Sequence, residues 1–183
     1  MSLISLQEPF TAENIKKLSC GDFVEISGVI YTARDAAHAR LIEALAQGDD
    51  LPITLKDQII YYAGPAPSRP GQVIGSCGPT TAGRMDSFTP ALIEAGIRGM
   101  IGKGPRSTEV VDVMKQFGAV YFAAVGGAAA LTSKCIVEAD VLAYEDLGPE
   151  AIRRLVVKNY PCLVAIDAQG RCIYDEGPRA FKK

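Results

Sequence analysis

Short apolar segments typical of buried strands alternate with helical segments through the middle of this chain, and this alternation restricts the folds open to it. Apolar residues alternate with polar ones in residues 23–31, form short runs in the other strand-like segments, and repeat with a helical period in the remaining segments. The expected strands are residues 23–31, 58–63, 98–102 and 119–125, and the expected helices are residues 36–47, 89–95 and 108–117. Strands that alternate with helices form crossover units with parallel strands. The sequence therefore predicts an α/β fold with a mixed central sheet flanked by helices.

The two ends of the chain depart from this alternation. The further expected elements are helices at residues 11–19, 126–131 and 149–157, a strand at residues 137–144, and a terminal hairpin of residues 162–167 and 171–175. No repeat, low-complexity run or linker divides the sequence. We therefore expect residues 1–183 to form one domain.

A turn rich in glycine and proline at residues 76–85 contains the residues best suited to bind an anion. It follows an apolar run and precedes a helical segment, and such a turn exposes backbone N–H groups at the positive end of a helix. Thr80 and Thr81 add hydroxyls, and Arg84 follows Thr80 by one helical turn. We interpret the turn as a carboxylate or phosphate site. The alternative is an ordinary capped helix with a solvated arginine.

Two further cations, Arg34 and Lys103, lie where strands are expected to end. Thr32 and Asp35 fit a capping box, which places Arg34 in the first turn of a helix, where the helix dipole disfavours a cation unless an anionic ligand is present. Each guanidinium can hold one carboxylate through paired hydrogen bonds. Together with Arg84, these cations favour a small dicarboxylic acid over a phosphate ester as the ligand. No pair of carboxylates and no metal-ligand set accompanies them in the sequence.

Other catalytic motifs fail on spacing. Gly102 and Lys103 lack the remaining requirements of a phosphate-binding loop, and no complete dinucleotide fingerprint is present. His38 is the only histidine, and it is either a hydrogen-bonded helix residue or a ligand. Nothing in the sequence places it beside Cys77, so a cysteine–histidine nucleophile has no support.

The composition limits the kinds of partner. The net charge is −2 and the pI is near 5.5, which argues against nucleic acid or an anionic membrane as the main partner. No apolar run approaches the roughly 18 residues of a membrane span. The first residues show neither a basic region nor a cleavage pattern, so we expect no export signal. Five widely spaced cysteines without a Cys-x-x-Cys pair indicate a reduced, cytoplasmic chain and suggest neither a disulfide scaffold nor a zinc site.

Four runs of the sequence closely resemble one family, in the same order. They are Gly28-Val-Ile-Tyr-Thr-Ala-Arg34-Asp35-Ala-Ala-His38, Tyr62-Ala-Gly64-Pro65, Gly78-Pro-Thr-Thr-Ala-Gly-Arg84-Met85 and Gly102-Lys103-Gly104. The family comprises the β subunits, or C-terminal domains, of class I iron–sulfur fumarases and L-tartrate dehydratases. The resemblance implies a swivelling β/β/α domain whose catalytic cleft forms against a separate α subunit. That partner would carry the [4Fe-4S] cluster, with no metal ligand from this chain, in a homodimer of heterodimers.

The resemblance also implies roles for individual residues. Thr80 matches the proposed catalytic base, and Lys103 matches a charge-stabilising catalytic group. The residues that match substrate-binding positions are Arg34, Arg84, Thr81, His38 and Gly78. A threonine hydroxyl is a poor base near neutral pH, so neighbouring cations and an acidic residue of the partner would have to assist it.

We therefore expect the β subunit of a fumarate hydratase, which interconverts fumarate and malate. The nearest alternative keeps the subunit role with L-tartrate as the substrate. An alternative of another class is a stand-alone domain that binds a dicarboxylate. An adjacent reading frame with three separated cysteines would favour the enzyme over the binding domain.

Overall fold

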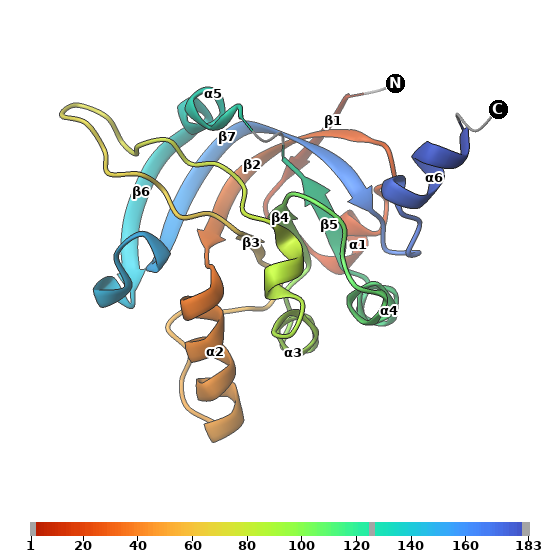
Figure 1. The fold of residues 1–183 in the computed structure, drawn as a ribbon, viewed down its shortest axis with the longest axis horizontal. Coiled ribbons are helices and arrows are strands. Elements are labelled where there is room, and N and C mark those ends of the chain that lie inside the picture. Colours follow the sequence, from red (N-terminus) through yellow and green to blue (C-terminus); the bar gives the residue numbers. More distant parts are fainter. Residues whose placement is uncertain (1–2, 125–126, 181–183) are drawn as a thin grey trace.

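One curved sheet forms the centre of the molecule. The computed structural model describes residues 3–124 and 127–180, and within them seven strands are hydrogen-bonded in the order β1–β2–β3–β4–β5–β7–β6 (Figure 1). The strands are β1 (Leu3–Gln7), β2 (Phe23–Thr32), β3 (Ile59–Tyr61), β4 (Gly99–Gly102), β5 (Val120–Ala123), β6 (Ile136–Ala143) and β7 (Ile152–Ile166). β2 also pairs with β7, so β2, β3, β4, β5 and β7 close into a ring, with β1 and β6 paired to the two long strands.

The sheet is mixed, as the sequence predicts. β1 to β5 pair in parallel along the order of the sheet, whereas β7 runs antiparallel to β2, β5 and β6. Parallel neighbours require crossover connections, and helices supply them between β2, β3, β4 and β5. The mixed α/β class is therefore confirmed.

Short helices lie between and after the strands. They are α1 (Ala12–Ile15), α2 (Asp35–Gln47), α3 (Thr89–Glu94), α4 (Thr108–Phe117), α5 (Ala129–Thr132) and α6 (Ile173–Ala180), together with the 3₁₀ segments η1 (Ala82–Met85), η2 (Ser133–Cys135) and η3 (Glu145–Glu150). In Figure 1, α2, α3 and α4 lie on the same side of the sheet. Successive side chains of a strand point to opposite faces, so Ile60 and Tyr62 pack with these helices, whereas Ile59 and Tyr61 join a second core cluster.

Local signals explain where the helices stop and start. Ser107 caps α4, because its hydroxyl accepts the N–H of Val110 at 3.3 Å. Gly118 ends α4 and Gly48 ends α2, both with the positive φ that glycine adopts at low cost. The expected helices 36–47, 89–95 and 108–117 are thus confirmed to within one residue at each end.

The C-terminal part of the chain differs from the prediction. Residues 149–157 are not a helix: they comprise the end of η3 and the start of the long strand β7. The second arm of the expected hairpin reduces to a single bridge between Ile166 and Cys172, after which α6 begins. β1 was not expected. Val125 and Gly126, which were assigned to a strand and a helix, lie outside the described residues.

Candidate functional site

The predicted site residues collect where the parallel strands β2, β3 and β4 end. These strands end at Thr32, Tyr61 and Gly102, and Arg34 and Lys103 follow the first and the last of them. In sheets of this kind, ligands bind outside the carboxyl ends of the strands. The location therefore suits a binding site, and it brings together residues that lie far apart in the sequence.

The segment that carries the two threonines inserts between the ends of β3 and β4. The N–H of Thr80 donates to the carbonyl of Tyr62 at 2.6 Å, and the N–H of Lys103 donates to the carbonyl of Thr80 at 3.1 Å. The N–H of Ala82 then donates to the carbonyl of Lys103 at 2.8 Å. These bonds fix Thr80 beside Lys103. The side chain of Thr80 is half-buried, and Thr81 and Lys103 are exposed.

The turn differs from the amide-lined anion site that the sequence suggested. The helix that follows it is only the 3₁₀ segment η1, and α3 begins later, at Thr89. The N–H groups of Thr80, Ala82 and Arg84 all donate to backbone carbonyls, so a ligand cannot use them. At these three positions only the side chains remain to bind a ligand.

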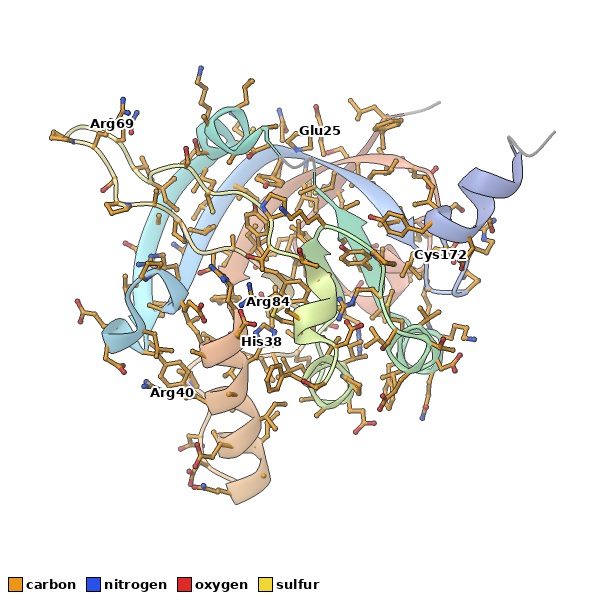
Figure 2. The ribbon with its side chains drawn as sticks, in the orientation of Figure 1. Glu25, His38, Arg40, Arg69, Arg84 and Cys172 are labelled. Carbon is orange, nitrogen blue, oxygen red and sulfur yellow. The ribbon has the colours of Figure 1, made fainter. Side chains whose placement is uncertain are left out.

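Asp35 joins the two arginines of the predicted site. Its Oδ1 accepts the Nε–H of Arg84 at 3.0 Å, and its Oδ2 lies 3.7 Å from a terminal nitrogen of Arg34. Arg84 is 52% exposed and Arg34 only 21% exposed. Figure 2 shows Arg84 above the first turns of α2, close to His38 and away from Arg40 further along the helix. The structure thus brings Arg34, Arg84 and the start of α2 into one cluster.

The start of α2 is capped by a distant residue and not by a local capping box. Arg34 occupies the N-cap position without a side-chain cap bond. Glu150 accepts the N–H of Ala36 at 2.9 Å and also lies 3.5 Å from Arg34. The hydroxyl of Thr32 instead donates to the carbonyl of Ala151 at 3.3 Å. The predicted capping box of Thr32 and Asp35 is therefore wrong, because β7 and the turn before it pack against this end of the helix and supply other partners.

His38 lies beneath this cluster and is fully buried. Its Nδ1 is 2.9 Å from the carbonyl of Arg34, its ring packs edge-on against Tyr62, and its Nε2 has no partner among the described residues. Burial lowers the pKa of His38 from 6.5 to about 4. A carbonyl can only accept, so Nδ1 carries the proton of the neutral ring and Nε2 is an unused acceptor.

Arg106 supports the site from below, and the sequence analysis did not identify it. Its side chain is fully buried, and it donates to Asp86 at 2.7 Å, to the hydroxyl of Tyr62 at 3.1 Å and to the hydroxyl of Thr89 at 2.7 Å. Its guanidinium also lies over the rings of Tyr62 and Tyr121. The carbonyl of Tyr62 in turn accepts the N–H of Thr80. No periodic pattern marks an isolated arginine in a loop, so only the three-dimensional structure identifies it.

Two glycines permit close approaches around the site. A Cβ atom at Gly64 would lie 2.8 Å from a terminal nitrogen of Arg34 and 3.2 Å from the carbonyl of Pro149. A Cβ atom at Gly78 would lie 2.9 Å from the Cβ of Ala129. Gly64 therefore leaves room for Arg34, whereas Gly78, a predicted substrate-binding residue, packs against α5.

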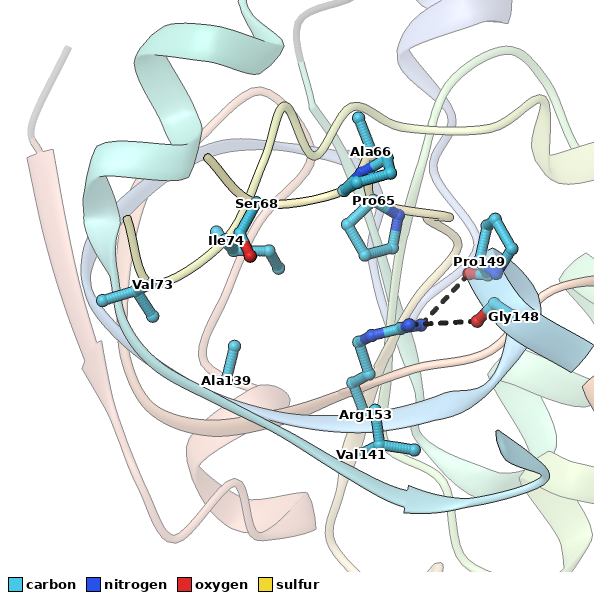
Figure 3. Close-up of a pocket in the computed structure, with 11 residues that line it drawn as sticks. Pro65, Ala66, Ser68, Val73, Ile74, Ala139, Val141, Gly148, Pro149 and Arg153 are labelled. Carbon is cyan, nitrogen blue, oxygen red and sulfur yellow. Dashed lines mark hydrogen bonds between the residues drawn. The ribbon is translucent and has the colours of Figure 1, made fainter. Parts of the chain in front are cut away.

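A hollow of about 490 Å³ lies beside the site, between the loop after β3 and the strands β6 and β7 (Figure 3). Most of its lining residues are apolar, and among the described residues that line it only Arg153 is charged. The guanidinium of Arg153 donates to the carbonyls of Gly148, Pro149 and Ala151 at 3.0–3.4 Å. Arg153 therefore holds the turn that carries Glu150, which faces Arg34.

The described residues do not fit an iron–sulfur cluster or another bound metal. Within residues 3–124 and 127–180, no group of three histidine, cysteine or acidic residues lies close enough to hold an ion. Burial raises the pKa of the Cys77 thiol to about 12 and raises that of Cys162 as well, although iron binds the thiolate form. We therefore assign no step of chemistry to a cluster on this chain.

Sequence comparison places the chain in a family. The model of the family described as "Fumarase C-terminus" matches residues 1–177, so this chain belongs to that family.

No helix within the described part of the chain is long and apolar enough to cross a membrane.

Named relatives fall into two kinds. The chain is 41% identical over 172 residues to "Putative L(+)-tartrate dehydratase subunit beta" of Methanocaldococcus jannaschii, covering 91% of this chain and 88% of that protein. It is 40% identical to "Fumarate hydratase class I, aerobic" of Escherichia coli K12, covering 84% of this chain and 28% of that protein. It is 36% identical to "Fumarate hydratase 2" of Leishmania major, covering 94% of this chain and 31% of that protein. The chain thus spans less than a third of the two fumarate hydratases but most of the separate subunit.

Proposed function

We propose that this chain is the β component of a hydro-lyase that acts on a small dicarboxylate, most simply the hydration of fumarate to malate. The observation that carries the proposal is the convergence of Arg34, Arg84, Lys103 and Thr80 at the ends of three adjacent strands. Family membership and the coverage of the relatives support a role as one part of a larger catalytic unit. In this proposal the chain is a swivelling domain, and a partner α subunit carries the [4Fe-4S] cluster.

The residues of this chain supply binding and charge stabilisation. Removing water from a 2-hydroxy diacid takes a proton from the carbon beside one carboxylate and the hydroxyl from the neighbouring carbon. Loss of that proton places a second negative charge on the adjacent carboxylate. Lys103 and Arg84 are the cations that would stabilise this charge, and oriented charges that act on the transition state are the strongest catalytic contribution a site can make.

Thr80 would take part in the proton transfer. Its backbone is fixed at both its N–H and its carbonyl, so the position of its Cβ atom is well defined. Within the described residues no side chain accepts from its hydroxyl, and the backbone N–H of Lys103 donates to its carbonyl. A neutral hydroxyl needs an acceptor for its own proton, which the partner would contribute. The proposed base is therefore incomplete without the second subunit.

A second candidate substrate is L-tartrate. The relative named as a tartrate dehydratase β subunit has nearly the same length as this chain, whereas the fumarate hydratases contain the equivalent region as part of a longer protein. Both substrates are dicarboxylates, so the same cations would bind either. A stand-alone dicarboxylate-binding domain is the remaining alternative.

The test is anaerobic co-expression with a cluster-bearing partner, followed by dehydration assays on malate and on tartrate. We expect activity from the complex and none from this chain alone. Dehydration by the isolated chain would contradict the subunit role, and dicarboxylate binding without activity in any complex would favour the binding domain. The ratio of kcat/KM for the two diacids then decides the substrate.

Two variants of the threonines test the proposed base. Thr80→Val removes the hydroxyl at nearly constant volume and should lower kcat by roughly two to four orders of magnitude, the usual contribution of a positioned acid or base. Thr81→Val is the matched control, since this exposed neighbour has the same chemistry, and it should cost far less. Equal, modest losses in both variants would show that these residues only bind the ligand.

A further inference from the structure

We propose that Asp35 is a positioning residue for the dicarboxylate site, and that it fixes Arg84 so that the outer edge of its guanidinium faces the ligand. The inference rests on the proposed function, because it assigns a purpose to the carboxylate between the two substrate-binding arginines. Asp35 is the first residue of α2, with its Oδ1 at 3.0 Å from Nε of Arg84 and its Oδ2 at 3.7 Å from Arg34.

The contact with Asp35 decides which edge of Arg84 is free. A guanidinium holds a carboxylate with two parallel N–H groups, either Nε with one terminal nitrogen or the two terminal nitrogens. Asp35 occupies Nε, and no other described side chain or carbonyl accepts from Arg84. The edge formed by the two terminal nitrogens therefore remains available, on a side chain that is 52% exposed.

An anion-binding site has an electrostatic reason to avoid such a carboxylate. Asp35 neutralises part of the positive charge that would attract a dianion, so on charge alone it weakens the site. It strengthens binding only if orientation matters more than net charge. An exposed arginine on a short 3₁₀ segment has many rotamers, and a fixed partner removes that freedom before the ligand arrives.

The position of Asp35 is itself well defined. It lies in the first turn of α2, where the helix dipole favours a negative charge. Glu150 holds the same turn through the N–H of Ala36, and Arg153 holds the backbone around Glu150 (Figure 3). Oδ2 of Asp35 and Nε of Arg34 are both buried without a hydrogen-bond partner in the described chain. Two buried polar atoms without hydrogen bonds destabilise the free chain, and such unsatisfied groups are expected at a site arranged for a ligand.

A double-mutant cycle in the assembled complex separates positioning from simple stabilisation. Asp35→Ala should lower kcat/KM by roughly 10- to 100-fold, mostly through KM, the range expected when an oriented donor is lost. In an Arg84→Met background the same substitution should cost less than about 3-fold, because its main target is gone. Asp35→Asn keeps an acceptor for Nε and should recover part of the loss. Equal fold-losses in both backgrounds would overturn the proposal.

The matched control breaks an arginine–carboxylate contact elsewhere. Glu138→Ala removes a partner 3.2 Å from Arg154 on β6 and β7, away from the site. It should leave kcat/KM unchanged and should change the melting temperature little, because Asp140 remains 3.6 Å from Arg154. Loss of activity in this control would mean that any broken ion pair suffices, and the proposal would fail.

A measurement on the full chain alone separates this inference from the proposed function. In nitrogen-15 NMR, the Nε–H of Arg84, assigned by its disappearance in Arg84→Met, should exchange slowly with water in the native chain and rapidly in Asp35→Ala. Unchanged exchange overturns the positioning role, whether or not the complex is active. The other outcome is slow exchange in a chain that binds no fumarate or malate and whose complex dehydrates no diacid. That result would keep the contact between Asp35 and Arg84 and reject the dicarboxylate site.

Discussion

Protonation of His38 is the perturbation whose consequence follows most directly from the structure. His38 is the only histidine of the chain and is fully buried, between the rings of Tyr62 and Phe88. Its Nδ1 faces the carbonyl of Arg34, which favours the charged ring, but burial dominates and lowers the pKa from 6.5 to about 4. The folded protein should therefore keep this ring neutral at neutral pH.

The magnitude follows from the difference in proton affinity between the folded and unfolded chains. Because the folded pKa lies below the unfolded value, the unfolded chain takes up the proton first as the pH falls. The stability contributed by the neutral ring is complete above pH 6.5 and is lost progressively as the pH falls towards 4. At about 1.4 kcal/mol per pH unit, the loss in the free energy of unfolding approaches roughly 3 kcal/mol.

Two measurements check this reasoning. A single histidine gives one set of ring signals in NMR, so its pKa and its tautomer can be read directly, and we expect a midpoint near 4 with the proton on Nδ1. Denaturant unfolding from pH 7.5 to 4 should show a steeper loss of stability in the native chain than in His38→Gln, which cannot titrate. A folded-state midpoint near 6.5, or equal pH dependence in the two proteins, would refute the reasoning.

Two further predictions concern the support of the site. Arg106→Met leaves Asp86 without its buried partner and should lower the free energy of unfolding by about 3–5 kcal/mol, which corresponds to a fall in Tm of roughly 6–20 °C. The control Arg154→Met breaks a more exposed ion pair and should cost under about 1 kcal/mol. Similar losses in the two variants would contradict the role of burial. Gly64→Ala places a methyl group 2.8 Å from Arg34 and should raise KM for the diacid, whereas Gly83→Ala meets no atom closer than 3.9 Å and should not; equal KM values would show that Arg34 moves freely.

The sequence identified the parallel strands β2 to β5 because the relevant signals are local. Short apolar runs and glycine stops define β3, β4 and α4 without reference to other parts of the chain. β7 was instead assigned to a helix at residues 149–157 and a strand at residues 162–167, and Asn159 and Pro161, residue types that are unfavourable within a strand, lie between the two. In the structure Asn159 adopts a positive φ, its N–H donates to Ser27, and a register shift between Ile26 and Gly28 accommodates the irregularity. Only pairing with β2 and β6 turns this segment into one strand.

The candidate site was likewise predicted only in part from the sequence. The cations Arg34, Arg84 and Lys103 were found from their types and spacing, and the structure brings them to one edge of the sheet. Their acidic partners were not found, because a contact such as that between Arg34 and Glu150 joins residues far apart in sequence. Pairings of this kind depend on the closure of the sheet between β2 and β7, for which no single segment carries a signal.

The acidic partners change what the cationic cluster can do. The sequence alone predicts three cations without acidic partners, and such a site would attract any dianion. In the structure Asp35 and Glu150 lie within 4.0 Å of the two arginines, and within the described residues Lys103 has no ion pair. In the proposed function, net charge would therefore contribute less to recognition than geometry does, and Arg84 and Lys103 would match the carboxylate spacing of a four-carbon diacid. Malate and tartrate share that spacing and differ by one hydroxyl group, so a comparison of the two tests whether the assembled site recognises the second hydroxyl.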